Sequence, residues 1–383
     1  MNQRTYLDYN ATAPLRPEVR EAVVDALGET GNPSSVHAEG RAARAAVEEA
    51  RAKVASLVGA QAEDVIFTSG GTEANALALG APAGEESWQC YISAIEHPAA
   101  LSGGRFHPET TTLIPVTADG VADIGALAQM LEKHKPGGWR PLVSLMAANN
   151  ETGAIQPLAG TANIVHEAGG LLHSDAVQAA GRIPLDMTAL GADMLTLSAH
   201  KIGGPKGIGA LVLAEGVRVE PLIKGGGQEG RRRAGTENVP GIVGFGVAAE
   251  LAAKELADVT ALASLRDALE EGVRAVAANV VILSASAPRL PNTSCMAVPG
   301  VKAETLVIGL DLAGIAVSAG SACSSGKMEA SHVLAAMGVA PEIANGAVRV
   351  SLGFGTKNDD IQRYVSAFGG LIKRLKRNAK EAA

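Results

Sequence analysis

Aromatic residues make up only 3% of this 383-residue chain, and it contains just three cysteines. Cys90, Cys295 and Cys323 lie far apart and match neither a metal-site spacing nor a disulfide framework, so the sequence predicts a protein of the reducing cytoplasm. No uninterrupted apolar run reaches membrane-spanning length, and the first residues lack the basic-then-apolar order of a signal peptide. We therefore expect no membrane association and no disulfide-rich scaffold.

Net positive charge is also absent. The formal net charge is −7 at pH 7, which argues against nucleic-acid binding as the main activity. Hydrophobic residues make up 47% of the chain and charged residues 19%, enough to build a large core. Because the chain exceeds the length at which a single core stops growing, we expect two domains. The expected large domain covers residues 13–259, and residues 1–12 and 260–383 form a smaller α+β domain.

Short apolar segments alternate with helix-like segments through the middle of the chain. This alternation predicts an α/β fold with a mainly parallel sheet covered by helices on both faces. Ligands of such sheets bind beyond the carboxyl ends of the strands. A long helical stretch over 247–279 is expected to lead into the second domain. The expected strands of the large domain are 65–68, 90–93, 112–116, 142–146, 170–173, 194–198 and 210–213.

Two of these strands end in polar residues that suit pyridoxal phosphate. His173–Gln178 follows one apolar run and Ser198–Lys201 follows the next. The amine of Lys201 would form a Schiff base with the cofactor, and the carboxylate of Asp175 would keep the pyridine nitrogen protonated. A structural Asp–Lys ion pair is the alternative.

Further polar groups follow other predicted strands. Thr68–Glu73 is a strand–turn–helix in which Gly71, Thr72 and the helix N-terminus favour a phosphate, with Ser198 and His200 as further donors. Ordinary turn chemistry explains the glycines equally well. His97 and Asn150 also come just after predicted strands. His97 is a candidate for ring stacking and proton exchange, whereas Asn149-Asn150 is either a simple turn or a source of donors.

Two residues of the second domain are candidates for substrate chemistry. Cys323 lies among small residues, in a loop expected over about 318–330 to be mobile, so we interpret it as a nucleophile. Arg349 lies inside an apolar strand, where it would either grip a substrate carboxylate or form an internal salt bridge. The basic, glycine-rich segment 224–236 is either a solvated loop or a segment that crosses a subunit boundary towards an anion.

The order of these motifs resembles the cysteine desulfurases, pyridoxal-phosphate enzymes of the class V aminotransferase family with fold type I. The cysteine loop resembles that of the NifS/IscS-type branch. One departure is the order Glu229-Gly230-Arg231, where the family usually has a basic residue and then glycine after the glutamate. The motifs that carry the resemblance are 6–12, 68–73, 96–97, 149–153, 175–178, 198–201, 225–236, 321–325 and Arg349.

The resemblance implies conversion of L-cysteine to L-alanine, with the sulfur left as a persulfide on Cys323. It implies a homodimer in which Thr236 reaches the partner's phosphate, and no resident metal, although Cys323 could transiently ligate an iron–sulfur cluster. It also implies a sulfur acceptor or iron–sulfur scaffold protein as partner, in a pathway that the sequence leaves open. The remaining implied roles are Lys201 and His97 in catalysis, Gly71, Thr72, Asp175, Gln178, Ser198 and His200 in cofactor binding, and Asn150 and Arg349 at the substrate carboxylate.

Two other functions compete with this one. A class V aminotransferase or lyase that acts on another amino acid would share every feature except the reactive thiol. A non-catalytic sulfur-relay scaffold would keep the fold without the chemistry. Cys323 argues against the first, and the intact set of Lys201, Asp175, His97 and Cys323 argues against the second.

Overall fold

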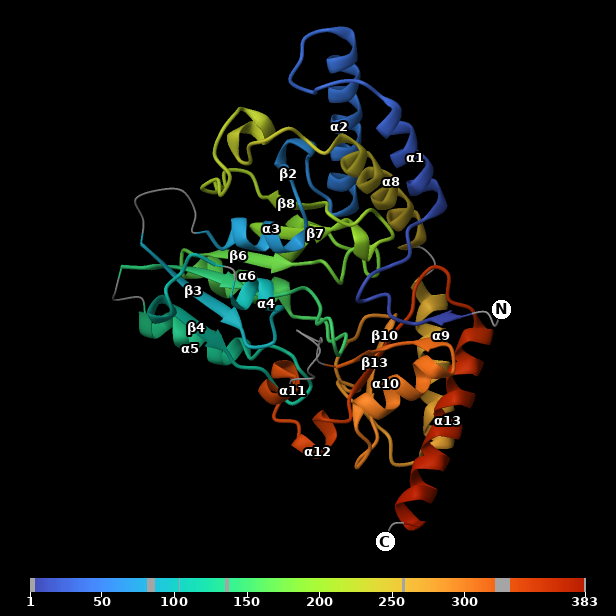
Figure 1. The fold of residues 1–383 in the computed structure, drawn as a ribbon. Coiled ribbons are helices and arrows are strands. Elements are labelled where there is room, and N and C mark those ends of the chain that lie inside the picture. Colours follow the sequence, from blue (N-terminus) through green and yellow to red (C-terminus); the bar gives the residue numbers. More distant parts are fainter. Residues whose placement is uncertain are drawn as a thin grey trace.

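A seven-stranded, mainly parallel sheet forms the centre of the larger part of the molecule (Figure 1). The computed structural model describes residues 4–80, 87–102, 104–134, 138–256, 259–320 and 331–381. β8 runs antiparallel to both of its neighbours, and the other strand pairs are parallel. The predicted α/β fold is confirmed. The strand order is β2 (Val65–Thr68), β8 (Gly209–Leu213), β7 (Met194–Ser198), β6 (Leu171–Asp175), β5 (Arg140–Ser144), β3 (Trp88–Ser93) and β4 (Thr111–Ile114).

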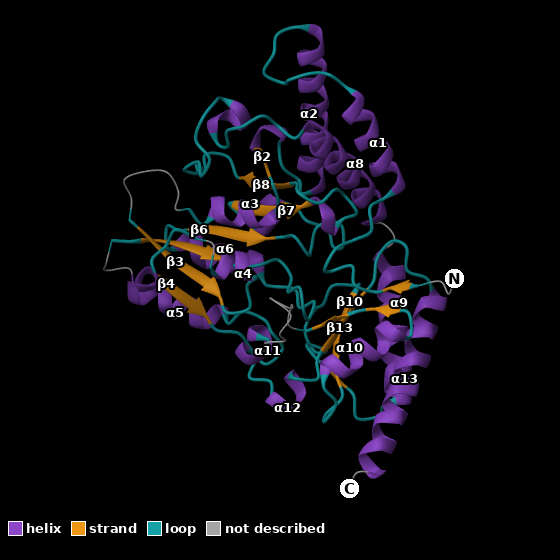
Figure 2. Ribbon diagram, viewed as in Figure 1, coloured by secondary structure: helices purple, strands orange, loops and turns teal. Residues whose placement is uncertain are grey.

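Both faces of this sheet are buried, which explains why its strands read as continuous apolar runs. Ile66 and its neighbours pack beneath α3 (Gly71–Ala78) on one face. Phe67 belongs to a larger core on the other face. Figure 2 shows helices on either side of the strands. The larger core is closed by α1 (Pro17–Gly28), α2 (Ala38–Leu57), α5 (Ile124–His134), α6 (Leu158–Glu167) and α8 (Val239–Glu255).

The single helical stretch expected over 247–279 is wrong. α8 begins earlier, at Val239, where the Asn238 side chain accepts a hydrogen bond from the Gly241 N–H. It ends at Glu255, and α9 (Val259–Val276) follows as a separate helix. The two helices bury their apolar faces in different cores, so one straight helix could not serve both. The sequence also gave no prediction of α1, in which Val19 is the one buried residue.

A second, smaller part of the molecule has a core of its own. It contains a four-stranded sheet with the order β12 (Ser318–Ala319), β13 (Val348–Ser351), β10 (Thr293–Ala297) and β9 (Val281–Ile282). α9, α10 (Ala303–Leu312) and α13 (Asn358–Glu381) pack on this core, and α13 lies alongside α9 (Figure 1). β1 (Thr5–Tyr6) pairs with β11 (Ile315–Ala316), so the start of the chain joins this part.

Short elements complete the described chain. They are α4 (Pro98–Leu101), α7 (Met187–Leu190), α11 (His332–Ala336), α12 (Pro341–Ala344) and the 3-10 helices η1 (Ala62–Asp64), η2 (Pro108–Thr110), η4 (Ala199–Lys201) and η5 (Gln228–Arg231).

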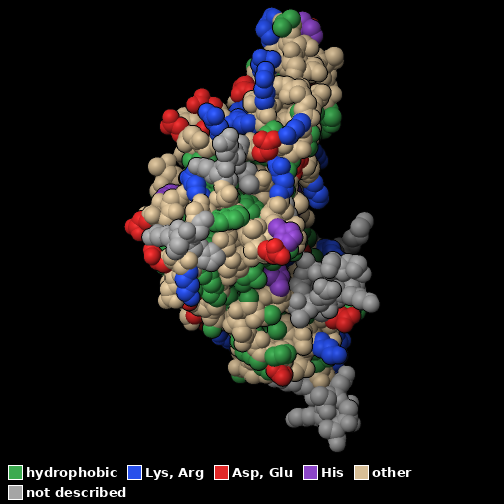
Figure 3. Space-filling view, turned by 90° about the vertical axis from the view of Figure 1, so that its left-hand side faces the viewer, with side chains coloured by type: hydrophobic (Ala, Val, Ile, Leu, Met, Phe, Trp, Pro, Cys, Tyr) green, Lys and Arg blue, Asp and Glu red, His purple; other side chains and the backbone are tan. Residues whose placement is uncertain are grey.

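On the face drawn in Figure 3, basic and acidic side chains intersperse over the upper part, and hydrophobic side chains gather lower down. This face therefore shows no continuous basic surface of the kind that nucleic-acid binding requires. Among the helices of the described ranges, none combines the length and apolar character needed to cross a membrane.

Candidate functional site

A cavity of about 240 Å³ opens at the carboxyl edge of the large sheet. β6 and β7 are hydrogen-bonded neighbours, and the loops after β3 and β5 reach the same edge. The polar residues that follow these strands therefore meet, as expected for a parallel sheet. The cavity is lined by Gly71, Thr72, Asn75, His97, Ala99, Met146, Ala148, Asn150, Asp175, Val177, Gln178, Ser198, His200 and Lys201. Every cofactor-binding residue expected from the sequence is in this set except Thr236.

Lys201 lies in the cavity wall, just after β7. Its Nζ donates hydrogen bonds to the backbone oxygens of Asn10, at 2.6 Å, and Ala11, at 2.9 Å. Burial, together with the nearby guanidinium groups of Arg182 and Arg349, lowers the pKa of the lysine to about 8. A lysine with a lowered pKa has a larger fraction of neutral amine near neutral pH, and only the neutral amine is a nucleophile.

Asp175 is held by two donors at the end of β6. Its Oδ2 accepts a hydrogen bond from Asn75 Nδ2 at 2.7 Å, and its Oδ1 accepts one from the Val177 N–H at 3.0 Å. The sequence analysis missed Asn75, which lies on α3 one turn after Thr72 and is buried. The sequence feature that could have identified Asn75 is a polar residue between apolar residues in a short helix. Asn75 keeps the carboxylate oriented towards the cavity.

One end of the cavity is equipped to bind a phosphate. A side chain at Gly71 would place its Cβ 3.1 Å from Val177 Cγ2 and 3.5 Å from Ser198 Cβ, so glycine leaves this space open. The first N–H groups of α3 have no partner within the helix. The hydroxyls of Thr72 and Ser198 have no hydrogen-bond partner among the described residues. Free hydroxyls at a helix N-terminus form a donor set typical of phosphate sites.

The imidazoles of His97 and His200 are both neutral near neutral pH. Burial lowers the pKa of His200 to about 4, and its Nδ1 lies 3.1 Å from the Thr12 hydroxyl. The surrounding protein also lowers the pKa of His97 by desolvation, and Lys201 adds to this effect. His97 Nδ1 accepts the Ala99 N–H at 3.1 Å, which places the proton of the neutral ring on Nε2.

Asn149 and Asn150 have different surroundings. Asn149 is fully buried, and its Oδ1 accepts hydrogen bonds from the N–H groups of Glu151 and Thr152, so it stabilises a turn. Asn150 lines the cavity, and its amide makes no hydrogen bond within the described chain. Asn150 is thus the residue of the pair that can meet a bound molecule.

Arg349 lies behind Asn150 and does not line the cavity. Its Nη1 donates to the Asn150 backbone oxygen at 3.0 Å, and its Nη2 pairs with Asp8 at 2.9 Å. The internal salt bridge that the sequence left open is therefore present. The Nε of Arg349 is nevertheless buried without a hydrogen-bond partner, so the guanidinium keeps one donor unused.

The segment 224–236 is tied to its own chain through several contacts. Glu229 is buried and pairs with Arg51 through both oxygens, at 2.7 and 2.9 Å. Arg233 pairs with Glu73 at 3.0 Å. The backbone is left-handed at Glu229, Gly230 and Arg231, a conformation for which Gly230 is well suited. The unusual order Glu229-Gly230-Arg231 therefore serves a turn that places the glutamate in the core.

Two candidate residues are not in the cavity. Thr236 is exposed and lines a separate depression with Phe67 and Glu229. Cys323 lies outside the described residues, as does most of its loop. Ser318 and Ser331, which flank that stretch, bind the carboxylates of Asp8 and Glu151.

Comparisons with known proteins agree with this site. The aminotransferase class-V family model matches residues 5–364. A cysteine desulfurase of Cereibacter sphaeroides is 46% identical over 98% of this chain and 97% of its own, and the cysteine desulfurase IscS of Dictyoglomus turgidum is 41% identical over 98% and 96%. The structure of a NifS-like protein from Rickettsia africae matches with a TM-score of 0.87 at 35% identity, covering 97% of this chain and all of that one. The chain belongs to the aminotransferase class-V family, in the group of NifS- and IscS-type cysteine desulfurases.

Proposed function

We propose that this protein is a pyridoxal-phosphate-dependent cysteine desulfurase. It converts L-cysteine to L-alanine and transfers the sulfur to Cys323 as a persulfide. The observation that carries the proposal is the single cavity in which Lys201, Asp175 and His97 meet the free donors of Thr72 and Ser198. The similarity to cysteine desulfurases over nearly the whole chain supports the same activity.

The residues of the cavity fit pyridoxal phosphate. When bound, this cofactor supplies an electron sink for bonds broken at the amino acid. Thr72, Ser198 and the start of α3 would hold its phosphate, because their donors are unused and Gly71 leaves room. Asp175 would hold its pyridine nitrogen, because Asn75 and the Val177 N–H already fix that carboxylate.

The chain's own groups then account for proton handling and positioning. Lys201 supplies the amine that binds the cofactor, and its lowered pKa favours the neutral form. His97 presents an Nε2–H from a ring whose Nδ1 is already fixed, so it can pass a proton near neutral pH. Asn150 would hold the substrate carboxylate through its free side-chain amide, and the guanidinium of Arg349, which lies directly behind Asn150, would supply the positive charge.

The sulfur transfer balances without an added oxidant. The thiolate of Cys323 attacks the substrate sulfur, forming an S–S bond while the bond between that sulfur and the substrate β-carbon breaks. The electron pair of the broken bond stays on the carbon side, where protonation completes alanine. The products are one alanine and one enzyme persulfide, which we propose a sulfur acceptor or iron–sulfur scaffold protein then receives.

The proposal is tested by the products formed from cysteine. Purified protein with pyridoxal phosphate, cysteine and a reductant should release alanine and sulfide in equal amounts. A lyase would instead give pyruvate with the sulfide, and an aminotransferase would need a keto-acid acceptor and release no sulfide. Amino-acid and keto-acid analysis of one reaction mixture distinguishes the three activities, and pyruvate as the main product would reject the proposal.

Loss of the Arg349 side chain should weaken cysteine binding. Arg349→Ala is expected to raise the KM for cysteine about tenfold or more, since a charge-assisted hydrogen bond contributes roughly 1.5–3 kcal/mol. Asp8→Asn is the matched control, because it removes the internal salt bridge but keeps the guanidinium. If both variants lose the same thermal stability while KM stays unchanged, Arg349 is purely structural.

We also propose a homodimer in which Thr236 completes the phosphate site of the partner subunit. Thr236 is exposed and outside the cavity of its own chain, so it is free to act elsewhere. Thr236→Ala should release cofactor several-fold faster, with an unchanged thermal unfolding midpoint. Sedimentation should find a dimer; a fully active monomer would contradict the proposal.

The chain would divide into a large cofactor-binding domain over 13–259 and a small domain from 1–12 and 260–383, because the two hydrophobic cores are separate.

We propose the cytoplasm as the location of this protein. Cys90 and Cys295 are buried free thiols, a state typical of proteins in a reducing compartment.

A further inference from the structure

Arg182 differs from the other buried arginines of the described chain because it has no carboxylate partner. Arg16 pairs with Glu255, and Arg51 and Arg349 are likewise paired with acidic side chains. Arg182 is 7% exposed and binds only uncharged oxygens. Burying a cation without a counter-ion is costly, so packing alone does not explain its presence.

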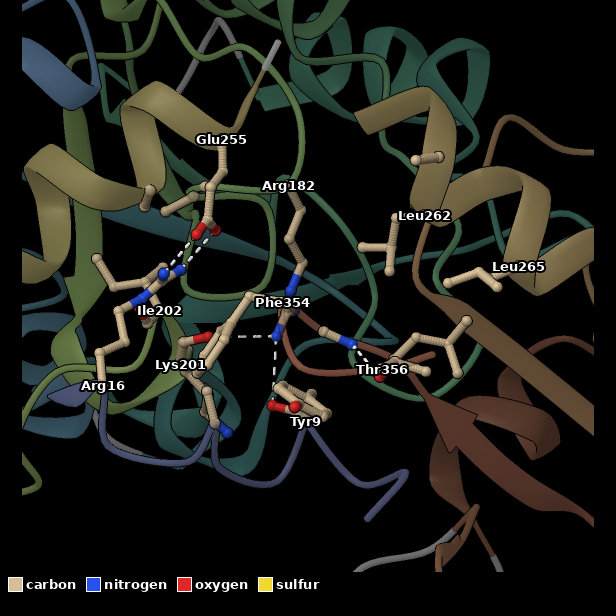
Figure 4. A pocket seen from close by; sticks show the side chains of 17 residues that line it. Tyr9, Arg16, Arg182, Lys201, Ile202, Glu255, Leu262, Leu265, Phe354 and Thr356 are labelled. Atoms are coloured by element: carbon tan, nitrogen blue, oxygen red, sulfur yellow. Dashed lines mark hydrogen bonds and ion pairs between the residues drawn. The ribbon is translucent and has the colours of Figure 1, made fainter. Parts of the chain in front are cut away.

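Three of the four uncharged oxygens around Arg182 belong to residues that line the active-site cavity. Its Nη1 donates to the backbone oxygen of Gln178 at 2.9 Å and also to the Gln178 Oε1. Its Nη2 lies 3.3 Å from the Tyr9 backbone oxygen and 3.4 Å from that of Lys201. Figure 4 shows Arg182 between Tyr9 and Lys201, at a second cavity of about 330 Å³. Arg182 therefore contacts two residues of the cofactor site from outside it.

The contact with Gln178 fixes the direction of its side-chain amide. A guanidinium can only donate hydrogen bonds, so the amide oxygen of Gln178 must face Arg182. Its Nε2 then donates to the Asn10 backbone oxygen at 3.0 Å and has a second N–H left for the cavity. Without Arg182, the amide could turn over and present an acceptor there instead.

The charge of Arg182 acts on Lys201. After burial, Arg182 is the largest contributor to the lowered pKa of the lysine, followed by Arg349. The carboxylates of Asp175 and Asp8 act in the opposite direction. The other titratable groups beside Lys201 are His97 and His200, whose lowered pKa values leave them uncharged near neutral pH.

We propose that Arg182 is a positioning residue that fixes the Gln178 amide and keeps one positive charge behind the Lys201 amine. The proposal rests on the proposed function for its cofactor. It goes further in assigning a role to a residue that touches neither cofactor nor substrate. The two effects should be separable by mutation. The orientation of the Gln178 amide depends on the forked shape of the guanidinium, and the effect on Lys201 depends only on its charge.

The test is a titration of the holoenzyme's visible absorption from about pH 6 to about pH 10, together with the rate of cofactor loss on dialysis. Arg182→Met should raise the midpoint for the Lys201 nitrogen by roughly half to one pH unit, because removing a nearby positive charge favours the protonated form. One unit corresponds to ~1.4 kcal/mol of charge interaction. It should also release cofactor several-fold faster. Arg182→Lys should keep the midpoint of the original protein but still release cofactor faster.

Arg16→Met is the matched control, because Arg16 lines the same second cavity but is not among the groups that shift the pKa of Lys201. Its midpoint should not move. An unchanged midpoint in Arg182→Met would overturn the charge effect, and normal cofactor retention in Arg182→Lys would overturn the amide effect. If Arg182→Met does not fold, Arg182→Gln replaces it, since glutamine can still bind the same carbonyl oxygens.

The readouts do not depend on sulfur transfer. If the original protein makes no alanine but the Arg182 variants show the expected shifts, the role of Arg182 is supported and the proposed function is rejected. If the original protein makes alanine but the variants show no shifts, the proposed function is supported and the role of Arg182 is rejected.

Discussion

Lys201→Ala should bind pyridoxal phosphate only non-covalently and should release no measurable alanine or sulfide from cysteine. We expect a loss of roughly 10³-fold or more, as for other residues that bond covalently to the reacting system. Lys201 is the single lysine among the cavity-lining residues of the described chain, so no neighbouring amine can replace it. The pKa of Lys201 is lowered by its burial at this position and by the charges of Arg182 and Arg349.

Borohydride reduction followed by peptide mapping measures directly whether the cofactor is covalently attached to Lys201. In the original protein the reduced cofactor should be found on the peptide that contains Lys201, and in Lys201→Ala it should wash away. Lys206→Ala is the control, because Lys206 is exposed and lies five residues further along the same loop. Label on Lys206, or a colourless protein that takes up no cofactor, would reject the site.

The central strands were predicted well because burial on both faces leaves a clear pattern. The predicted bounds of β2 and β7 agree with the structure. Each is a short apolar run that ends at a polar residue, and burial on both faces requires such a run. The strands predicted over 170–173 and 194–198 placed Asp175 and Lys201 correctly at one edge of the sheet.

The sequence could not predict residues that act through another residue. Asn75 reaches Asp175 because α3 packs beside the end of β6, a contact between positions one hundred residues apart. Arg182 reaches Gln178 within one turn, yet its importance depends on lacking a carboxylate partner. Neither property leaves a local periodic signal. The break between α8 and α9 was missed for the same reason, since it depends on two cores.

The pairing of Arg349 with Asp8 shows where sequence reasoning must leave alternatives open. A charged residue in an apolar strand predicts a partner, but not which one. The structure adds the two facts that matter, namely a bond to the Asn150 backbone and an unused Nε. Together they make Arg349 a residue that can serve both structure and substrate.

Cys323→Ser should bind cofactor and cysteine normally but release neither alanine nor sulfide. Serine keeps the size of the side chain and removes the nucleophile, so cysteine should still change the visible absorption of the bound cofactor. Sulfur transfer should fall below detection, because an alcohol of ordinary pKa cannot accept the sulfur atom. Stopped-flow absorption and product analysis of the same samples measure the two effects.

Cys90 and Cys295 provide the matched controls, because both are buried. Burial raises the pKa of each thiol to about 12, so neither forms a thiolate near neutral pH. Cys90→Ala and Cys295→Ala should remain active, since alanine leaves no unpaired hydroxyl in the core. The original protein, incubated with cysteine, should gain the mass of one sulfur atom on the peptide that contains Cys323. Alanine formation by Cys323→Ser at the original rate, or added sulfur on Cys90 or Cys295, would show that the nucleophile is not Cys323.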